Sequence, residues 1–140
     1  MLQFPAPPPA PLRGARRGAG KLRPNGSRCA LTLCGRRIYP VLLELVRHVR
    51  PQVAALERRD ADLARQCRRA LASAPLNVAE GSYNRGKNRV ARYHTALGSL
   101  REALACFEVA AALGYMPDVE PELRRRFDHV IGTLVRLVGH

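Results

Sequence analysis

At 140 residues the chain is long enough for one domain with a substantial core and too short for two. Hydrophobic residues make up 46% of it and aromatic residues only 5%, with no Trp, so a core must consist of aliphatic side chains and alanine, which disfavours a β-sheet. The formal net charge is +13, and no stretch approaches the roughly 18 apolar residues of a membrane-spanning helix, so we expect no membrane association through such a helix.

Residues 1–37 differ in composition from the rest of the chain. They hold eight of the 24 basic residues and no acidic residue, together with six of the 11 prolines and five of the 11 glycines. Such a segment buries too little apolar surface to offset the entropy of ordering it, so we predict a disordered basic tail. A transit peptide, a nucleic-acid-binding arm and a segment without a role remain alternatives. Residues 38–140 are predicted to be the folded domain.

A first helix is predicted from Ile38 onward, because apolar residues recur there at helical spacing. Pro40 falls in its first turn, where proline is tolerated, whereas Pro51 is expected to kink the helix or to end its first half near Arg50. The predicted inward face consists of Ile38, Leu42, Leu45, Val49 and Val53.

A second helix is expected to begin after Asp60 or Asp62, since either carboxylate can accept hydrogen bonds from the free N–H groups at a helix start. Gly81 is expected to stop this helix, because glycine commonly follows the last helical residue. The predicted inward positions are Leu63, Cys67, Ala70, Ala74 and Asn77.

The third and fourth helices have the clearest periodicity. Gly114, followed by Pro117, predicts the end of the third helix, and Asp118 or Glu120 is expected to cap the fourth. Short connections imply antiparallel neighbours, so the predicted fold is all-α, an antiparallel up-and-down four-helix bundle. The predicted inward residues are Tyr93, Leu97, Leu100, Leu104, Phe107 and Ala111, then Leu123, Phe127, Val130, Leu134 and Leu137.

The third helix also carries a second stripe, on the side opposite its leucines, made mostly of small residues. Small side chains let another helix approach closely, so we predict a subunit interface there. The alternative is an ordinary alanine-rich surface, since alanine is the best helix former. The stripe consists of Ala91, Thr95, Gly98, Glu102, Ala105, Val109 and Ala112.

Polar residues interrupt the apolar pattern of the second helix. Pro75 frees a backbone carbonyl one turn earlier, and Ser73 and Asn77 are suited to repair that defect. Arg69, Glu80 and Glu102 are predicted to form an ion-pair network between the second and third helices. If this network is buried, removing Glu80 should cost about 3–5 kcal/mol.

The sequence gives little support for a catalytic site or a metal-binding site. Glu80 and Glu102 could form a general acid and base, but arginine nearby would keep both ionised. A di-iron bundle needs Glu-x-x-His motifs on two helices, whereas Glu44 and His48 are four residues apart. No carboxylate lies at a spacing that suggests a relay with His94 or His129. We therefore predict a protein that is not an enzyme, with no cofactor, no metal and no catalytic residue.

The four cysteines do not have the spacing of a zinc site. Cys29 and Cys34 have no second close pair. Cys67 and Cys106 fall among apolar positions, and we expect them to be reduced, buried thiols. Reduced thiols fit a cytoplasmic protein.

Several pieces of the second and third helices together form a fairly specific motif. The pieces are Gln66, Cys67, Arg68, Arg69 and Ala70, then Ser73, Asn77, Ala79, Glu80 and Gly81, then Gly98, Ser99 and Glu102, and finally Leu113, Gly114 and Tyr115. With this motif, residues 38–138 resemble the four-helix bundle proteins encoded in bacterial 23S ribosomal RNA intervening sequences. That family is related to the accessory protein of diversity-generating retroelements, and both are homopentameric barrels of four-helix protomers.

The resemblance implies a homo-oligomer, most simply a pentamer, with a basic surface and a partnership with RNA or a reverse transcriptase. The structural motif that it carries over comprises Arg69, Ser73, Asn77, Glu80, Gly81, Gly98 and Glu102. The start of the third helix departs from the family pattern, because residues 85–89 replace a Ser-bearing cap.

We therefore expect a non-catalytic, homo-oligomeric bundle that binds structured nucleic acid, RNA by the resemblance, through basic surface. The alternative is a protein-assembly adaptor that docks a partner such as a reverse transcriptase without binding nucleic acid itself. A charge cluster can also be no more than a solvated face. The residues expected to contact nucleic acid are Arg85, Lys87, Arg89 and Arg92 at one bundle end, with Arg65, Arg68, Arg124 and Arg125 elsewhere.

Overall fold

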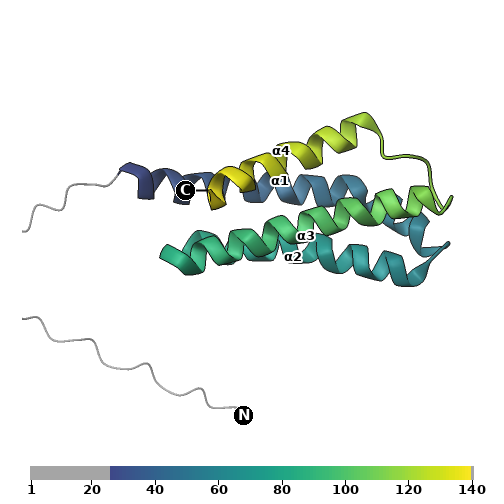
Figure 1. Ribbon diagram of the computed structural model, residues 1–140, viewed down its shortest axis with the longest axis horizontal. Coiled ribbons are helices and arrows are strands. Elements are labelled where there is room, and N and C mark those ends of the chain that lie inside the picture. The colour runs from purple at the N-terminus through teal and green to yellow at the C-terminus, as the bar shows by residue number, and fades with distance from the viewer. Residues whose placement is uncertain (1–25, 140) are drawn as a thin grey trace, which may run out of the picture.

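The computed structural model describes the backbone of residues 26–139 and the side chains of residues 37–139. The described residues form four helices: α1 (Gly26–Glu57), α2 (Ala61–Tyr83), α3 (Gly86–Ala112) and α4 (Pro121–Val138). Each helix packs against its neighbours in the chain, and α1 also packs against α4 (Figure 1). The predicted antiparallel up-and-down bundle is confirmed.

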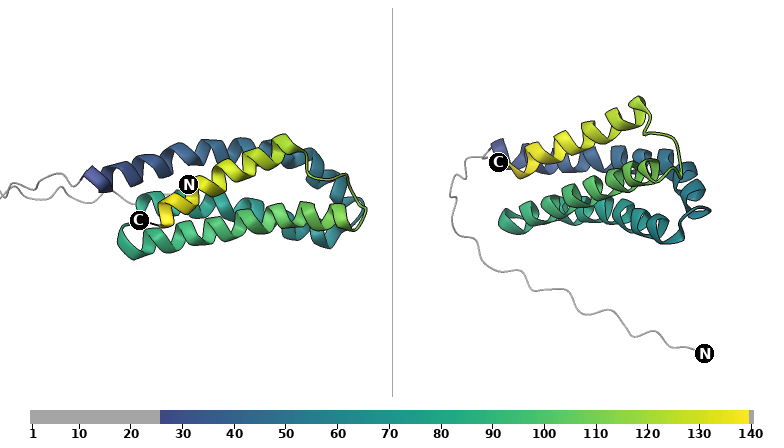
Figure 2. Two further views of the ribbon diagram at one scale, coloured as in Figure 1. Left: turned by 45° about the horizontal axis from the view of Figure 1, so that its top comes forward. Right: turned by 45° about the vertical axis from the view of Figure 1, so that its right-hand side comes forward.

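The turns lie at the two ends of the bundle. The α2–α3 turn lies at the end where α4 finishes, whereas the α1–α2 turn and the α3–α4 loop lie at the opposite end (Figure 2). Residues near the α2–α3 turn are therefore separated from those at the starts of α2 and α4 by most of the length of the bundle.

Helix α1 begins earlier than predicted. It starts at Gly26, within the segment predicted to be tail, instead of at Ile38. The sequence between Pro24 and Pro40 contains no proline and several good helix formers, so nothing in it interrupts the helix that the core nucleates. The rest of the predicted tail, residues 1–25, lies outside the described residues.

Pro51 does not end α1 near Arg50. The helix continues to Glu57 with both prolines inside it. Val53 and Leu56, which follow Pro51, are buried. Burying this second part of the apolar face offsets the hydrogen bond that proline removes from a helix.

The start of α2 agrees with prediction, and its end does not. Asp60 is the N-cap, and its carboxylate accepts a hydrogen bond from the Leu63 backbone N–H at 2.9 Å. The helix passes through Gly81 and ends at Tyr83. Gly81 instead allows a close helix contact, because a Cβ atom there would lie 2.5 Å from Cε1 of Tyr93, which is fully buried.

The end of α3 is set by Gly114, as predicted. Gly114 has a left-handed φ of 74°. The Tyr115 N–H donates to the Ala110 carbonyl at 2.9 Å, and the Gly114 N–H donates to the Ala111 carbonyl at 2.9 Å. This pair of hydrogen bonds is a Schellman motif, which satisfies carbonyls that the end of a helix leaves free.

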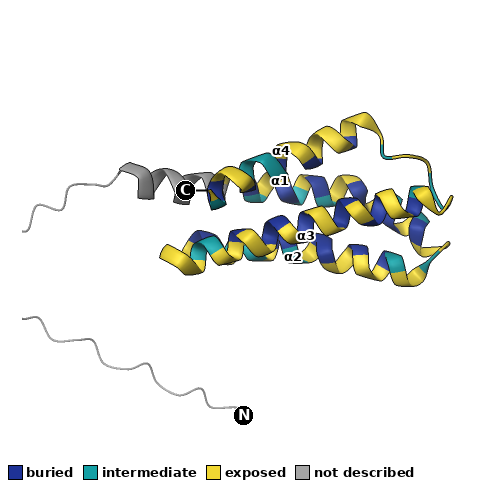
Figure 3. Ribbon diagram, in the orientation of Figure 1, coloured by how far each residue is buried: buried dark blue, intermediate teal, exposed yellow. Residues whose placement is uncertain are grey.

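The core follows the predicted periodicity. The rings of Phe107 and Phe127 meet edge to face, with their centroids 6.3 Å apart. Among the predicted inward residues only Leu63, Asn77 and Ala111 are partly exposed, and the others are buried (Figure 3). The second stripe of α3 is exposed throughout, so its predicted orientation away from the core of its own protomer is confirmed.

Candidate functional site

Helices α2 and α3 share the most extensive packing in the bundle, and an open groove of about 600 Å³ runs between them on their outer side. Three of the seven residues of the predicted structural motif, Arg69, Ser73 and Glu102, line this groove together. The packing of the two helices therefore gathers onto one surface residues that are far apart in sequence. The complete lining is Asp62, Arg65, Gln66, Arg69, Ala70, Ser73, Ser99 and Glu102.

Two hydroxyl groups join the helices at the groove. The Ser99 hydroxyl, almost completely buried, lies 2.8 Å from Ser73 Oγ and 2.9 Å from the Thr95 carbonyl oxygen, to either of which it can donate. Asn77 Nδ2 donates to the Ser73 carbonyl at 2.9 Å and to Ser73 Oγ at 3.2 Å. Asn77 therefore bonds its own helical turn rather than the Leu71 carbonyl, which is the one that Pro75 leaves free.

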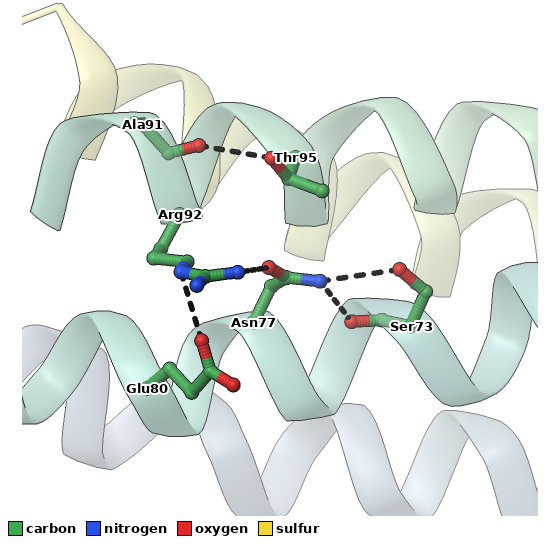
Figure 4. A network of polar contacts seen from close by, with 6 residues as sticks. All are labelled: Ser73, Asn77, Glu80, Ala91, Arg92 and Thr95. Atoms are coloured by element: carbon green, nitrogen blue, oxygen red, sulfur yellow. Dashed lines mark hydrogen bonds and ion pairs between the residues drawn. The ribbon is translucent and has the colours of Figure 1, made fainter. Parts of the chain in front are cut away.

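Arg92 connects this chain of hydrogen bonds to Glu80. Its Nη1 donates to Asn77 Oδ1 at 3.3 Å, and its Nε lies 2.8 Å from Glu80 Oε2 (Figure 4). Ser73, Asn77 and Glu80 come from α2, whereas Arg92 comes from α3. The arginine thus ties the two helices together near their shared turn.

The predicted network of Arg69, Glu80 and Glu102 is wrong in its partners. Glu80 pairs with Arg92, and Glu102 accepts a hydrogen bond from Gln66 Nε2 at 3.2 Å. Within residues 37–139 Arg69 forms no ion pair with either carboxylate. Sequence spacing along one helix does not specify how the neighbouring helix is rotated, and that rotation selects the partners.

The energetic role predicted for Glu80 changes accordingly. The side chains of Arg92 and Glu80 keep 48% and 55% of their exposure, so water screens the ion pair. We expect Glu80→Ala to lower the free energy of unfolding by about 1 kcal/mol or less. Urea denaturation of Glu80→Ala beside Glu80→Gln would measure this, and a loss of 3 kcal/mol or more, the buried-network range, would contradict it.

Five of the eight predicted nucleic-acid contacts already have a carboxylate partner. The ion pairs of Arg68 with Glu57 and of Arg125 with Glu122 lower the pKa of both carboxyl groups, chiefly through hydrogen bonds from the arginines. A phosphate would have to compete with these carboxylates. The five pairs are Arg65 with Asp62, Arg68 with Glu57, Arg92 with Glu80, Arg124 with Glu108 and Arg125 with Glu122.

The other three predicted contacts lie together at the α2–α3 turn. Arg85 and Lys87 are exposed, and Arg89 Nε donates to the Asn84 carbonyl at 2.8 Å. In the part of the chain with described side chains, none of the three forms an ion pair with a carboxylate. We name Arg85, Lys87 and Arg89 the turn cluster. Of the eight predicted contacts, these three are the ones that no described carboxylate neutralises.

The eight predicted contacts do not form one patch. The turn cluster and Arg92 lie at the α2–α3 end of the bundle. Arg65 and Arg68 belong to the first turns of α2, and Arg124 and Arg125 to the first turns of α4, which both start at the opposite end (Figure 1). The structure therefore separates the predicted surface into two regions.

Cys67 and Cys106 are free and buried, as predicted. Burial raises the pKa of the Cys67 thiol to about 12, with a further contribution from Cys106. Burial, and then the charge of Glu102, also raises the pKa of Cys106. Both thiols therefore stay protonated and unreactive at neutral pH.

These shifts predict a loss of stability in alkali. Unfolded thiols release protons from about pH 9 upward while the folded Cys67 retains its proton until about pH 12, so the unfolded state gains stability between these values. We expect the free energy of unfolding to fall by up to ~1.4 kcal/mol per pH unit for each such thiol. Denaturation curves of the wild type and Cys67→Ala across this range would measure it, and equal slopes would contradict it.

Other functional chemistry is sparse in the described part of the chain. Within it, no group of three or more His, Cys, Asp or Glu side chains could hold a metal ion. His48, His94 and His129 are all exposed. None of the described helices is long and apolar enough to cross a membrane.

Two features of the α2–α3 end were missed from sequence. Asn77 and Arg92 lie at equal distances along the sequence from the turn residues Asn84 and Arg85. Residues placed in this way on two antiparallel helices are expected to be in contact, as these two are. Tyr83, the last residue of α2, is 81% exposed, although aromatic residues are usually at least partly buried. The location of Tyr83 in an otherwise polar stretch is the sequence feature that could have predicted this exposure.

Comparison with known protein families identifies a match over most of the chain. The model of the family described as 23S rRNA-intervening sequence protein matches residues 39–136. This range covers almost the whole bundle, including the groove and the turn cluster. No curated protein and no solved structure matches the chain.

Proposed function

Because the chain belongs to the 23S rRNA-intervening sequence protein family, we propose that it is a non-catalytic homo-oligomer that binds structured RNA through basic surface. The turn cluster is the observation that carries this proposal. Arg85 and Lys87 are exposed cations without a carboxylate partner among the described side chains, and no acidic residue lies between Glu80 and Glu102 in the sequence. Arginine and lysine in such a setting bind phosphate oxygens, which supply most of the affinity in sequence-independent recognition.

An assembly of several copies would strengthen this binding. A cyclic oligomer would repeat the turn cluster around one rim, and linked weak contacts raise the overall affinity without any new contact type. The exposed small-residue stripe of α3 supports such an assembly, because Gly98 and Ala105 would let a helix of a neighbouring subunit approach closely. A pentamer is the assembly that the family resemblance implies.

Light scattering of Gly98→Leu tests the assembly. Gly98 is exposed and has nothing near the position of an added Cβ, so leucine there disturbs no contact inside the protomer. We expect the wild type to be an oligomer and the variant to shift toward the monomer mass. Asp128→Leu, which places the same side chain on an exposed position of α4, should keep the oligomer. A wild type that is a stable monomer would refute the assembly.

Fluorescence anisotropy with a labelled RNA hairpin tests the binding. The protein should first be treated with nuclease to remove co-purified nucleic acid. We expect binding at low salt with little dependence on hairpin sequence. If the wild type does not bind at low salt, the adaptor alternative takes the place of this proposal, and a stably retained protein partner would support it.

A further inference from the structure

Tyr83 is highly exposed and takes no part in the core of the bundle. It is the last residue of α2, and 81% of its surface is accessible. Of the other described aromatic residues, none is exposed: Tyr93, Phe107 and Phe127 are buried, and Tyr39 and Tyr115 are partly buried. An aromatic ring left in water forgoes the stabilisation that burial would give. Such a residue is a natural candidate for contact with a ligand.

The surroundings of Tyr83 identify the charge of that ligand. The turn cluster follows Tyr83 directly in the chain, and the hydrogen bond from Arg89 Nε to the Asn84 carbonyl holds this arginine against the turn. The nearest acidic residue in sequence, Glu80, is already paired with Arg92. Three cations thus follow the ring within six residues of the chain, and the nearest carboxylate in sequence, that of Glu80, is paired with Arg92. This arrangement favours a polyanion that also offers a flat apolar face.

Unpaired nucleotides have both features. Their bases expose a π face that stacks on tyrosine, and their phosphates bind lysine and arginine. In an RNA duplex each base is stacked between its neighbours, so its flat face is not accessible to a side chain on the protein surface. Each nucleotide of a single strand carries one phosphate and one planar base, so negative charge and flat faces repeat along it.

We propose that Tyr83 stacks on an unpaired base while Arg85, Lys87 and Arg89 bind the adjoining phosphates, so that the α2–α3 turn selects single-stranded stretches of RNA such as loops, bulges and ends. This inference rests on the proposed function and adds the class of RNA structure that the protein selects. The four residues lie at one end of the bundle, so in a cyclic oligomer each subunit would offer one such site on the same rim.

Two substitutions at Tyr83 and two probes test the inference. Tyr83→Leu keeps an apolar side chain but removes the ring, whereas Tyr83→Phe keeps the ring. Because the side chain is exposed, neither change should disturb folding. The probes are a short unstructured single-stranded RNA and a blunt RNA duplex, each measured by anisotropy with nuclease-treated protein at the same salt concentration.

We expect Tyr83→Leu to weaken binding of the single strand by roughly 5-fold to 150-fold, which is the range for loss of one base–aromatic stack. Duplex binding should stay within about twofold of wild type, since phosphate contacts dominate there. Tyr83→Phe should bind both probes as the wild type does.

Several outcomes would overturn the inference. If Tyr83→Leu binds the single strand as tightly as the wild type while Lys87→Glu/Arg89→Glu binds weakly, the stacking role is refuted and the proposed function survives. If Tyr83→Leu dissociates the oligomer, the ring belongs to a subunit interface instead. If the wild type binds neither probe at low salt, the inference and the proposed function both fail.

Discussion

Gly81→Ala should destabilise the bundle by about 1–3 kcal/mol, which is the usual cost of overpacking a core. A Cβ atom at this position would lie 2.5 Å from Cε1 and 2.8 Å from Cδ1 of Tyr93, and 3.3 Å from Cβ of Arg92. The Tyr93 ring cannot move aside, because it is fully buried in the core. Helices α2 and α3 would therefore have to separate near their turn.

A loss of stability in Gly81→Ala would indicate a steric clash, because replacing glycine by alanine inside a helix normally stabilises it by about 1 kcal/mol. Gly132 provides the matched control: it lies inside α4, and nothing lies within 4 Å of an added Cβ atom. We expect Gly132→Ala to leave stability unchanged or raise it, and Gly81→Ala to lower it. Urea denaturation measures both, and a Gly81→Ala variant as stable as the wild type would show that the helix contact at Tyr93 is looser than described.

Reversing charge in the turn cluster should have the largest effect on RNA binding. Lys87→Glu/Arg89→Glu turns two cations per subunit into anions at the site proposed to bind phosphates. We expect the affinity for every RNA sequence to fall by about tenfold or more, because lost phosphate contacts weaken binding regardless of sequence. Loss of the hydrogen bond from Arg89 to Asn84 costs only about 1 kcal/mol, so the fold should persist.

A charge-matched control lies at the other end of the bundle. Arg58 and Arg59 are exposed in the α1–α2 turn, so Arg58→Glu/Arg59→Glu changes the net charge by the same amount away from the turn cluster. We expect this variant to bind RNA more tightly than Lys87→Glu/Arg89→Glu. Equal losses in the two variants would mean that overall charge, and not the α2–α3 turn, determines affinity. Circular dichroism and light scattering of both variants would verify that fold and assembly are kept.

The sequence predicted the core and the helix directions well because both depend on regular spacing. Phe107 and Phe127, for example, fall on the inward faces that their periodicity assigns. The role of Gly81 could not be predicted in the same way. From local sequence preferences, a glycine near a helix end predicts the end of the helix. Here glycine is required at position 81 because Tyr93 of another helix packs too closely for a Cβ atom. Such a requirement exists only in three dimensions.

The charged residues illustrate the same limit. The pair of Asp62 and Arg65 is local, three residues apart on one helix, and sequence spacing indicates it. The pair of Glu80 and Arg92 depends on how α2 and α3 are rotated about their axes, which spacing along one helix does not give. For this reason the sequence identified the basic residues but not which of them have no carboxylate partner among the side chains of residues 37–139.

The salt dependence of RNA affinity is the most direct test of the claim that the α2–α3 turn binds phosphates. For nuclease-treated wild-type protein, the logarithm of the association constant should fall linearly with the logarithm of salt concentration, with a slope of roughly −0.7 per phosphate contact on single strands. The slope should be flatter for Lys87→Glu/Arg89→Glu and unchanged for Arg58→Glu/Arg59→Glu. An affinity that stays constant between about 50 and 200 mM salt, or a slope that Lys87→Glu/Arg89→Glu leaves unchanged, would contradict the claim.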